Sequence, residues 1–285
     1  MAAPAGGDGT VRPVVKVRLD TLLHQRGLFD SRSRAAASVM AGEVRVGGEP
    51  ASKAGQMVSE DAVVDVAERP RFVSRGGVKL ANAVAALGVD VAGRRCLDVG
   101  ASTGGFTDFL LQEGAAHVVA YDVAYGELHW SLRTDERVTV IERANARRMT
   151  PEELPYRPDL IVADVSFISL TKVLPAVLAC AASEGFDALA MIKPQFEVGR
   201  EKIGSGGVVR DAGDRVGALV AVARASRDAT GCSVLGFASS GLPGPKGNRE
   251  SFVWLAEPGR PGALGDDGIA EAAAAVEAVG EQATS

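Results

Sequence analysis

Polar side chains stand at the ends of three successive apolar runs of the sequence. Asp98 lies in the run RRCLDVG, Asp122 in HVVAYDV, and Asn145 ends VTVIERAN. In open α/β sheets, ligands bind beside the carboxyl ends of the strands. A carboxylate placed there can accept hydrogen bonds from ribose hydroxyls, and an amide can meet the edge of an adenine. The pattern therefore predicts a site for a nucleoside-like ligand.

A glycine-rich turn follows the first of these runs and leads into a helical pattern, CLDVGASTGGFTDFLL. Its glycines, Gly100, Gly104 and Gly105, have the spacing G-x-x-x-G-G, whereas a dinucleotide site needs G-x-G-x-x-G and a P-loop needs Gly-Lys-Ser/Thr. This spacing leaves room for an adenosine that carries no phosphate, as in S-adenosylmethionine. The alternative is a tight strand-to-helix turn without a ligand, and the polar residues at the strand ends favour the cofactor site.

The predicted S-adenosylmethionine site combines the glycine-rich turn with the ends of the strands that follow it. Its residues are Asp98, Gly100, Ala101, Ser102, Thr103, Gly104, Gly105, Phe106, Thr107, Asp122, Asn145 and Asp164.

The elements that must position this site alternate along the chain. Apolar runs recur as RRCLDVG, HVVAYDV, VTVIERAN, DLIVADVS and DALAMIKP, and the segments between them are suited to helices. Such alternation predicts an α/β fold, a doubly wound Rossmann-like domain with a parallel sheet. Near the end of the chain, CSVLGFASS and SFVWLAE flank a loop rich in glycine and proline, which predicts a terminal strand pair.

A small α+β domain is predicted ahead of the large one. Leu19, Leu22 and Leu23 share one face of a first helix, and a second helix begins after Ser31 and ends at Gly42. Short strands follow. The chain has 285 residues and is thus predicted to comprise five segments. They are a disordered start at 1–13, the small domain at 14–67, a linker at 68–77, the large domain at 78–257, and a disordered acidic, alanine-rich tail at 258–285.

Charge is distributed unevenly along the chain. The net charge is −5, which alone argues against a general nucleic-acid binder. However, the segment from Arg12 to Lys53 holds eight Lys or Arg against four Asp or Glu, and the segment from Glu257 to Ser285 holds six acids against one Arg. A basic N-terminal domain and an acidic tail together account for the modest total.

The composition argues against several other classes of protein. The start of the chain lacks the apolar core of a signal peptide, and no uninterrupted apolar run is long enough to span a membrane. Cys96, Cys180 and Cys232, like the three histidines, show no spacing typical of metal ligands. The prediction is a cytoplasmic protein with reduced thiols, no metal and no membrane partner.

Several sequence blocks resemble a known family. The segment RLDTLLHQRGLFDSRSRAAASVMAGEVRVGGEPASKAG resembles an S4 RNA-binding domain, and FVSRGGVKL, CLDVGASTGGFTDFLL, ADVSFISL, IKPQFE and GNRESF resemble the blocks of TlyA-family proteins. The resemblance covers residues 14–257. It implies an FtsJ-type domain that transfers a methyl group from S-adenosylmethionine to cytidine 2′-hydroxyls of 16S or 23S ribosomal RNA, and a link to sensitivity to ribosome-directed cyclic peptide antibiotics.

The resemblance also implies a catalytic Lys-Asp-Lys-Glu tetrad, whose members here are Lys79, Asp164, Lys193 and Glu250. The sequence independently places Asp164 and Lys193 at successive strand ends and Glu250 in the loop that enters the last strand. Only the resemblance assigns Lys79. A ribose hydroxyl must lose its proton as it attacks, so a lysine there would act as a base or stabilise the developing oxyanion. The sequence DVSF also differs from the Asp/Asn-Pro-Pro-aromatic motif of base-amine methylases, which favours a hydroxyl target.

The basic domain is predicted to bind ribosomal RNA or ribosomal subunits through phosphate contacts. The residues predicted to make these contacts are Arg18, Arg32, Arg34, Arg45 and Lys53. Ordinary exposed helix charges are the alternative interpretation. Two rival functions stay open beside the methyltransferase: a membrane-lytic hemolysin and a non-catalytic ribosome-assembly factor. The oligomeric state is open as well.

Overall fold

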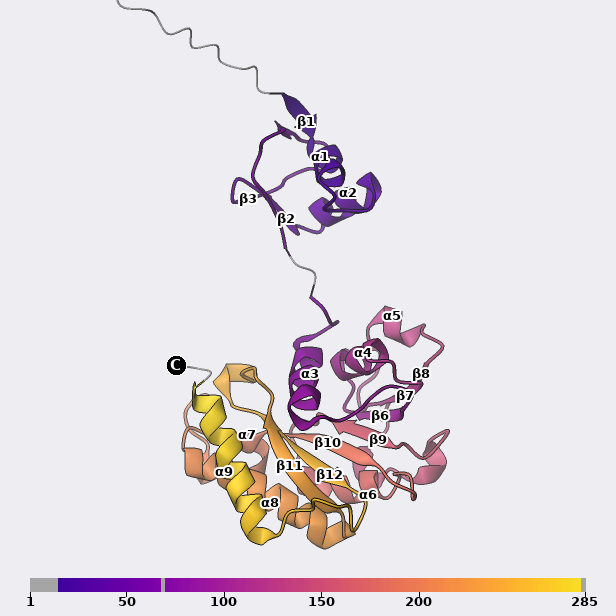
Figure 1. Cartoon of the computed structure of the whole chain (residues 1–285), viewed down its shortest axis with the longest axis vertical. Coiled ribbons are helices and arrows are strands. Elements are labelled where there is room, and N and C mark those ends of the chain that lie inside the picture. The colour runs from indigo at the N-terminus through magenta and orange to yellow at the C-terminus, as the bar shows by residue number, and fades with distance from the viewer. Residues whose placement is uncertain (1–14, 68–69, 283–285) are drawn as a thin grey trace, which may run out of the picture. The chain divides into compact units, whose positions relative to one another are not determined.

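The chain folds into two compact units, Met1–Pro70 and Arg71–Ser285. The computed structural model describes residues 15–67 and 70–282 (Figure 1). The predicted disordered start, residues 1–13, lies outside the described residues. Each unit has its own hydrophobic core.

Within residues 15–67, the first unit contains two helices and five short strands. Its elements are β1 (Lys16–Arg18), α1 (Leu19–Gln25), α2 (Arg32–Met40), β2 (Val44–Val46), β3 (Glu49–Pro50), β4 (Met57–Ser59) and β5 (Val64–Val66). Strand β1 pairs with β4, and the other three form a sheet in the order β3-β2-β5.

Local sequence signals shape this unit as predicted. The three leucines of α1, Leu19, Leu22 and Leu23, are buried together in its core. Ser31 caps α2, because its side chain accepts a hydrogen bond from the backbone N–H of Arg34 at 3.2 Å. Gly42 follows α2 with a φ of +77°, a conformation that favours glycine. The α+β prediction for this unit is confirmed.

The second unit is built on a seven-stranded sheet in the order β11-β12-β10-β9-β6-β7-β8. Its strands are β6 (Arg95–Val99), β7 (His117–Tyr121), β8 (Val138–Ile141), β9 (Leu160–Ala163), β10 (Asp187–Ile192), β11 (Ser233–Ser239) and β12 (Ser251–Ala256). The five strands β6 to β10 are parallel, whereas β12 is antiparallel to both β10 and β11. The predicted terminal strand pair is therefore confirmed.

Helices cover both faces of this sheet (Figure 1). They are α3 (Arg75–Leu87), α4 (Gly105–Gln112), α5 (Trp130–Arg133), α6 (Leu174–Leu178), α7 (Pro194–Glu197), α8 (Ala212–Thr230) and α9 (Asp266–Gln282). One core cluster joins the sheet to α3 and α4, and another joins it to α6, α8 and α9. The predicted doubly wound Rossmann-like fold is confirmed.

The order of the strands fixes where a ligand site must lie. The chain runs from β6 outward to β7 and β8, then crosses back to β9 on the other side of β6. The strand order therefore reverses between β6 and β9. Ligands of doubly wound sheets bind at such a switch point, outside the carboxyl ends of the strands.

The prediction of a disordered tail over residues 258–285 is wrong. Residues 266–282 form α9, in which Ile269 and Ala273 are fully buried against α8 and the sheet. Alanine is the strongest helix former, and the four-residue spacing of these two residues gives α9 one buried face. The alanine-rich composition therefore indicated a helix rather than disorder.

The predicted linker, residues 68–77, is too long. Phe72 is 3% exposed and packs edge-on against Phe109 of α4, with ring centroids 5.7 Å apart. Helix α3 begins at Arg75, after Ser74. Residues from Arg71 onward therefore belong to the second unit, because a buried aromatic ring anchors them to its core.

Candidate active site

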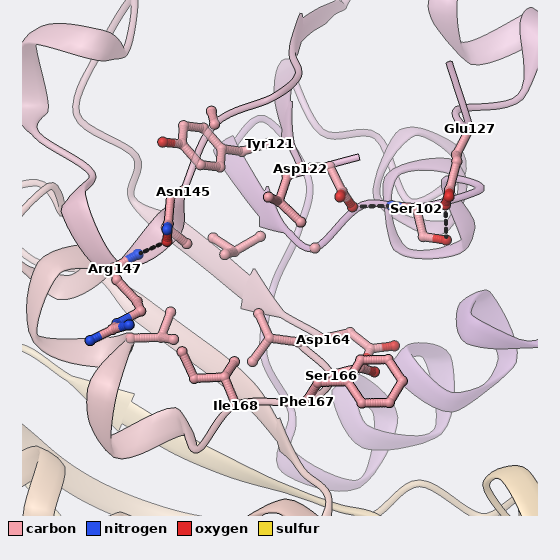
Figure 2. A pocket seen from close by; sticks show the side chains of 17 residues that line it. Ser102, Tyr121, Asp122, Glu127, Asn145, Arg147, Asp164, Ser166, Phe167 and Ile168 are labelled. Atoms are coloured by element: carbon pink, nitrogen blue, oxygen red, sulfur yellow. Dashed lines mark hydrogen bonds between the residues drawn. The ribbon is translucent and has the colours of Figure 1, made fainter. Parts of the chain in front are cut away.

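A cavity of about 520 Å³ opens at the switch point of the sheet. Figure 2 shows its lining side chains, which come from the ends of β6, β7, β8 and β9. Of the predicted cofactor residues, it is lined by Gly100, Ser102, Asp122, Asn145 and Asp164. Its volume is typical of sites for small ligands.

A second, smaller cavity of about 130 Å³ shares Gly100, Ser102 and Asp164 with the first. It is lined in addition by the predicted residues Ala101, Thr103, Gly105 and Phe106, and by Lys79. The shared residues make the two cavities neighbours at one edge of the sheet. The glycine-rich turn therefore lies between a large and a small compartment.

The glycines of the turn allow the backbone to pack closely. Gly100 has a φ of +83°, and a Cβ atom there would lie 2.3 Å from the carbonyl oxygen of Asp164. At Gly105 a Cβ would lie 2.2 Å from Oγ of Ser74, and at Gly104 it would lie 2.3 Å from Cδ1 of Leu132. Side chains at these positions would push the turn away from the neighbouring strand and helices, so the spacing of the glycines reflects three separate close approaches.

Asp122 is held by the backbone around it. Its Oδ2 accepts a hydrogen bond from the N–H of Ser102 at 2.7 Å (Figure 2). Its Oδ1 accepts one from the N–H of Ala124, also at 2.7 Å. Each carboxylate oxygen has a further lone pair for a ligand hydroxyl. This arrangement fits the predicted role of Asp122 in binding a ribose.

Asn145 also has a local structural role. Its Oδ1 caps a short 3₁₀ helix by accepting from the N–H of Arg147 at 3.1 Å. No hydrogen bond from its Nδ2 occurs within residues 15–67 and 70–282. The amide therefore keeps a donor for a ligand in the cavity that it lines.

Asp98 and Thr107 are fully buried and line neither cavity. Oγ1 of Thr107 donates to Oδ2 of Asp98 at 2.7 Å, whereas Oδ1 of Asp98 has no hydrogen-bond partner in the described part of the chain. Burial raises the pKa of Asp98 to about 7, and the charges of Asp164 and Asp122 add to the rise while Thr107 opposes it. A cationic group nearby would satisfy this carboxylate, which fits a sulfonium cofactor.

The four tetrad residues lie at one edge of the sheet in two ion pairs. Asp164 follows β9 and Lys193 follows the adjacent β10, and Nζ of Lys193 lies 2.5 Å from Oδ1 of Asp164. Because β12 is antiparallel to β10, Glu250 at its start reaches the same edge, where it pairs with Lys79 of α3. The structure thus brings together all four residues that the sequence predicted, while their catalytic roles stay predictions.

The two pairs differ in their surroundings. The side chain of Glu250 is 0% exposed and that of Lys79 is 10% exposed. Asp164 is 26% exposed and lines both cavities, and Nζ of Lys193 also donates to Oγ of Ser166 at 2.8 Å. The carboxylate of Asp164 is therefore open to both cavities and that of Glu250 to neither, whereas Lys79 lines the smaller cavity and Lys193, whose side chain is 11% exposed, lies behind Asp164.

Sequence reasoning missed several residues of the large cavity. They include Glu127, whose Oε2 accepts from Oγ of Ser102 at 3.1 Å, and Phe167, which is 91% exposed at a φ of +65°. Phe167 lies beside Phe196, with ring centroids 5.3 Å apart. Phe167 could have been found, since it follows a strand end closely. Glu127 lies in an irregular loop, and no local pattern marks it.

In the first unit, the predicted RNA-binding residues are partly tied to carboxylates. Arg18 and Arg32 both approach the buried Asp20, at 2.6 and 3.7 Å. The hydrogen bonds from Arg18 lower the pKa of Asp20 to about 2 despite its burial. The other predicted residues lie apart from this cluster: Arg34 pairs with Asp30, Arg45 donates to the carbonyl of Gly48, and Lys53 is exposed.

No helix in residues 15–67 and 70–282 is long and apolar enough to cross a membrane. The same residues contain no group of three or more side chains arranged to hold a metal ion.

Two protein-family models match the chain. The model of FtsJ-like methyltransferases matches residues 72–257, which is most of the chain, and the model of the S4 domain matches residues 17–64. The two matches fall within the two compact units of the structure.

Similar proteins carry two kinds of name. The chain is 52% identical over 243 residues to the 16S/23S rRNA (cytidine-2'-O)-methyltransferase TlyA of Mycobacterium tuberculosis, a match that covers 84% of this chain and 90% of that protein. It is 40% identical over 196 residues to Hemolysin A of Brachyspira hyodysenteriae, covering 68% and 81%. A solved structure from Streptococcus thermophilus, named as a candidate hemolysin, matches with a TM-score of 0.70 and 37% identity over 95% of this chain and 98% of that one.

Proposed function

Because the chain belongs to the TlyA family of FtsJ-like methyltransferases with an S4 domain, we propose that it methylates cytidine 2′-hydroxyls of 16S or 23S ribosomal RNA. The observation that carries this proposal is the ion pair of Lys193 and Asp164 at the cavity, beside a turn suited to an adenosine ligand. Such a substrate places the enzyme in the cytoplasm.

The residues present fit S-adenosylmethionine as the methyl donor. Asp122 and Asn145 would hold the nucleoside, and the unpartnered oxygen of the buried Asp98 suits its positive charge. When bound, this cofactor supplies an electrophilic methyl group.

Lys193 is the residue that would activate the attacking ribose hydroxyl. Its Nζ, held by Asp164 and Ser166, would take the proton of the ribose hydroxyl or stabilise the oxyanion as the oxygen bonds to carbon. The cofactor, held by Asp122 and Asn145, would supply the methyl group and keep the electron pair of its carbon–sulfur bond. The protein's further contribution is alignment of the hydroxyl with the methyl group.

The decisive experiment incubates the purified protein with radiolabelled S-adenosylmethionine and separated ribosomal subunits, followed by mapping of 2′-O-methyl marks. We expect label on cytidines with wild type and none with Lys193→Ala. Label on base nitrogens, or equal label with the variant, would contradict the proposal. An unlabelled ribosome together with lysis of erythrocytes by the same preparation would instead support the hemolysin function.

The S4 unit supplies the second test. We expect the double change Arg32→Glu and Arg34→Glu to weaken subunit binding, since both side chains are suited to phosphate contacts, while the affinity for S-adenosylmethionine stays intact. The measurement is filter binding over a series of salt concentrations, with thermal unfolding to verify the fold. Equal binding by wild type and variant at every salt concentration would remove these arginines from the RNA interface.

A further inference from the structure

A buried charge cluster joins α9 to the elements behind the active site. Glu277 of α9 is 6% exposed, and its Oε1 accepts hydrogen bonds from Nε of Arg215 at 2.6 Å and from a terminal nitrogen of Arg249 at 3.1 Å. Arg215 lies on α8, and Arg249 lies in the loop before β12. Glu277 and Arg215 are both buried and each requires a paired partner, whereas the side chain of Arg249 is 29% exposed, so the cluster links its three elements through one buried pair and one more exposed pair.

This cluster leads to the tetrad residue Glu250 by two routes. The first is direct, because Arg249 immediately precedes Glu250 in the chain. In the second, Arg215 donates to the carbonyl oxygens of Val209 and Arg210 at 3.2 and 2.7 Å.

Asn248 completes the second route. The backbone N–H of Val209 donates to Oδ1 of Asn248 at 3.0 Å, and Asn248 is 2% exposed. Its carbonyl in turn accepts from the N–H of Gly244 at 2.8 Å. The loop that carries Glu250 is therefore attached to the cluster at two of its residues, Asn248 and Arg249.

The position of Glu250 depends on this loop. A Cβ atom at Gly244 would lie 2.2 Å from Oε1 of Glu250, so the loop backbone presses directly against the carboxylate. On its other side the loop is not closely packed, because Arg249, Glu250 and Glu277 line a cavity of about 130 Å³. The backbone bond from Ser240 to the carbonyl of Glu250 at 3.0 Å and the pair with Lys79 hold the loop on one side, and the charge cluster adds the tie at Arg249 on the other.

We propose that Glu277 is a positioning residue for methyl transfer: it holds Arg249 and Arg215, and through them the loop that sets Glu250 against Lys79. The inference rests on the proposed function, and it assigns a role to a helix far along the chain from the glycine-rich turn. Glu277 itself lines neither of the two cavities of the active site.

The test compares single-turnover methyl transfer to ribosomal subunits by wild type and Glu277→Gln, at a temperature where circular dichroism shows both to be folded. The variant keeps the shape of the side chain and loses its charge. We expect the rate to fall about 10- to 100-fold, the size expected when a reacting group is misplaced, with unchanged affinity for S-adenosylmethionine. Glu271→Gln, an exposed acid on the same helix, should match wild type.

Two further variants separate positioning from general stability. Ile269→Val trims the fully buried anchor of α9 and should lower the melting temperature without lowering the rate. In a Glu250→Gln background, Glu277→Gln should cause no further loss, because residues that act as a unit are not additive. A normal rate for Glu277→Gln, or a full additional loss in the Glu250→Gln background, would overturn the inference. Absence of methyl transfer by wild type would instead overturn the proposed function itself.

Discussion

The two lysine–carboxylate pairs of the site are built from the same side-chain types in different surroundings. Lys193 and Asp164 come from adjacent strand ends, and Asp164 lines both cavities. Lys79 and Glu250 lie 171 positions apart in the chain, and the carboxylate of Glu250 is fully buried. The carboxylate of the first, accessible pair is open to both cavities, whereas that of the second, enclosed pair is covered by the fold and only Lys79 reaches the smaller cavity.

This difference predicts a division of roles. Exposed ion pairs add little to stability, and Asp164 is 26% exposed while Lys193 also bonds to Ser166, so changes at Lys193 or Asp164 should affect the reaction more than the fold. Removal of one partner of a buried pair strongly destabilises the protein, because the other charge is left without compensation. Changes at Lys79 or Glu250 should therefore reduce stability as well as activity.

The largest effect is expected at the accessible pair. Lys193→Ala should lower single-turnover methyl transfer by about 10²- to 10⁴-fold, the range for a positioned proton-transfer group. Lys193→Arg should not restore the rate if Lys193 is the base, since a guanidinium stays protonated. Unfolding by urea should show nearly unchanged stability for both variants. Near-normal rates for Lys193→Ala would exclude it as base and as oxyanion stabiliser, and an active arginine variant would leave only the electrostatic role.

The enclosed pair should give the largest loss of stability. Glu250→Ala leaves the ammonium of Lys79 buried and unpaired, so the free energy of unfolding should fall by about 3–5 kcal/mol. Adding Lys79→Met removes that charge and should recover much of the stability without recovering activity. Urea unfolding followed by circular dichroism measures both variants, and Asp164→Ala serves as the matched control. Equal destabilisation by Glu250→Ala and Asp164→Ala would refute the division of roles.

The affinity for S-adenosylmethionine should depend on Asp122, which lines the large cavity, and not on the enclosed pair of Lys79 and Glu250. Asp122→Ala removes a charged acceptor and should weaken binding of S-adenosylmethionine by about 1.5–3 kcal/mol, or roughly 10- to 100-fold. Glu250→Gln, in the enclosed pair, should leave the affinity within about twofold of wild type. Isothermal titration calorimetry compares the two. Unchanged affinity for Asp122→Ala would show that this carboxylate does not bind the cofactor.

The smallest effect concerns pH. Burial raises the pKa of Asp98 to about 7, so its carboxyl group is mostly protonated well below that pH and mostly ionised above it. A cationic ligand favours the ionised form, which means that binding releases a proton and that affinity rises as the pH increases toward and past this value. We expect a rise of about three- to tenfold between pH 6 and pH 8, because each pKa unit corresponds to a tenfold change in the equilibrium.

Asp98→Asn provides the control for this pH effect. Its amide oxygen can still accept from Thr107, so the local hydrogen bond survives while the titrating group is lost. Calorimetry in buffers of different ionisation enthalpy reports the released proton directly. A flat profile for wild type, or the same slope for the variant, would show that Asp98 does not govern the pH dependence.

Local patterns in the sequence determined much of the fold and of the cavity. The sequence indicates a sheet with a ligand at its carboxyl edge. The evidence is the apolar runs that lead to Asp98, Asp122 and Asn145, together with the spacing of the turn glycines. The Ser31 cap was equally local. These features were predictable because strand periodicity, turns and caps depend on residues within a few positions of one another.

The tertiary structure alone decided which distant residues meet. Residue types did not show that Glu250 closes on Lys79, that Glu127 reaches Ser102, or that α9 packs so as to bury Glu277. The same charged residues could equally have been solvated, because periodicity describes one segment at a time. Their partners are set by how the sheet and its helices pack, and the burial created by that packing makes each charge require a partner.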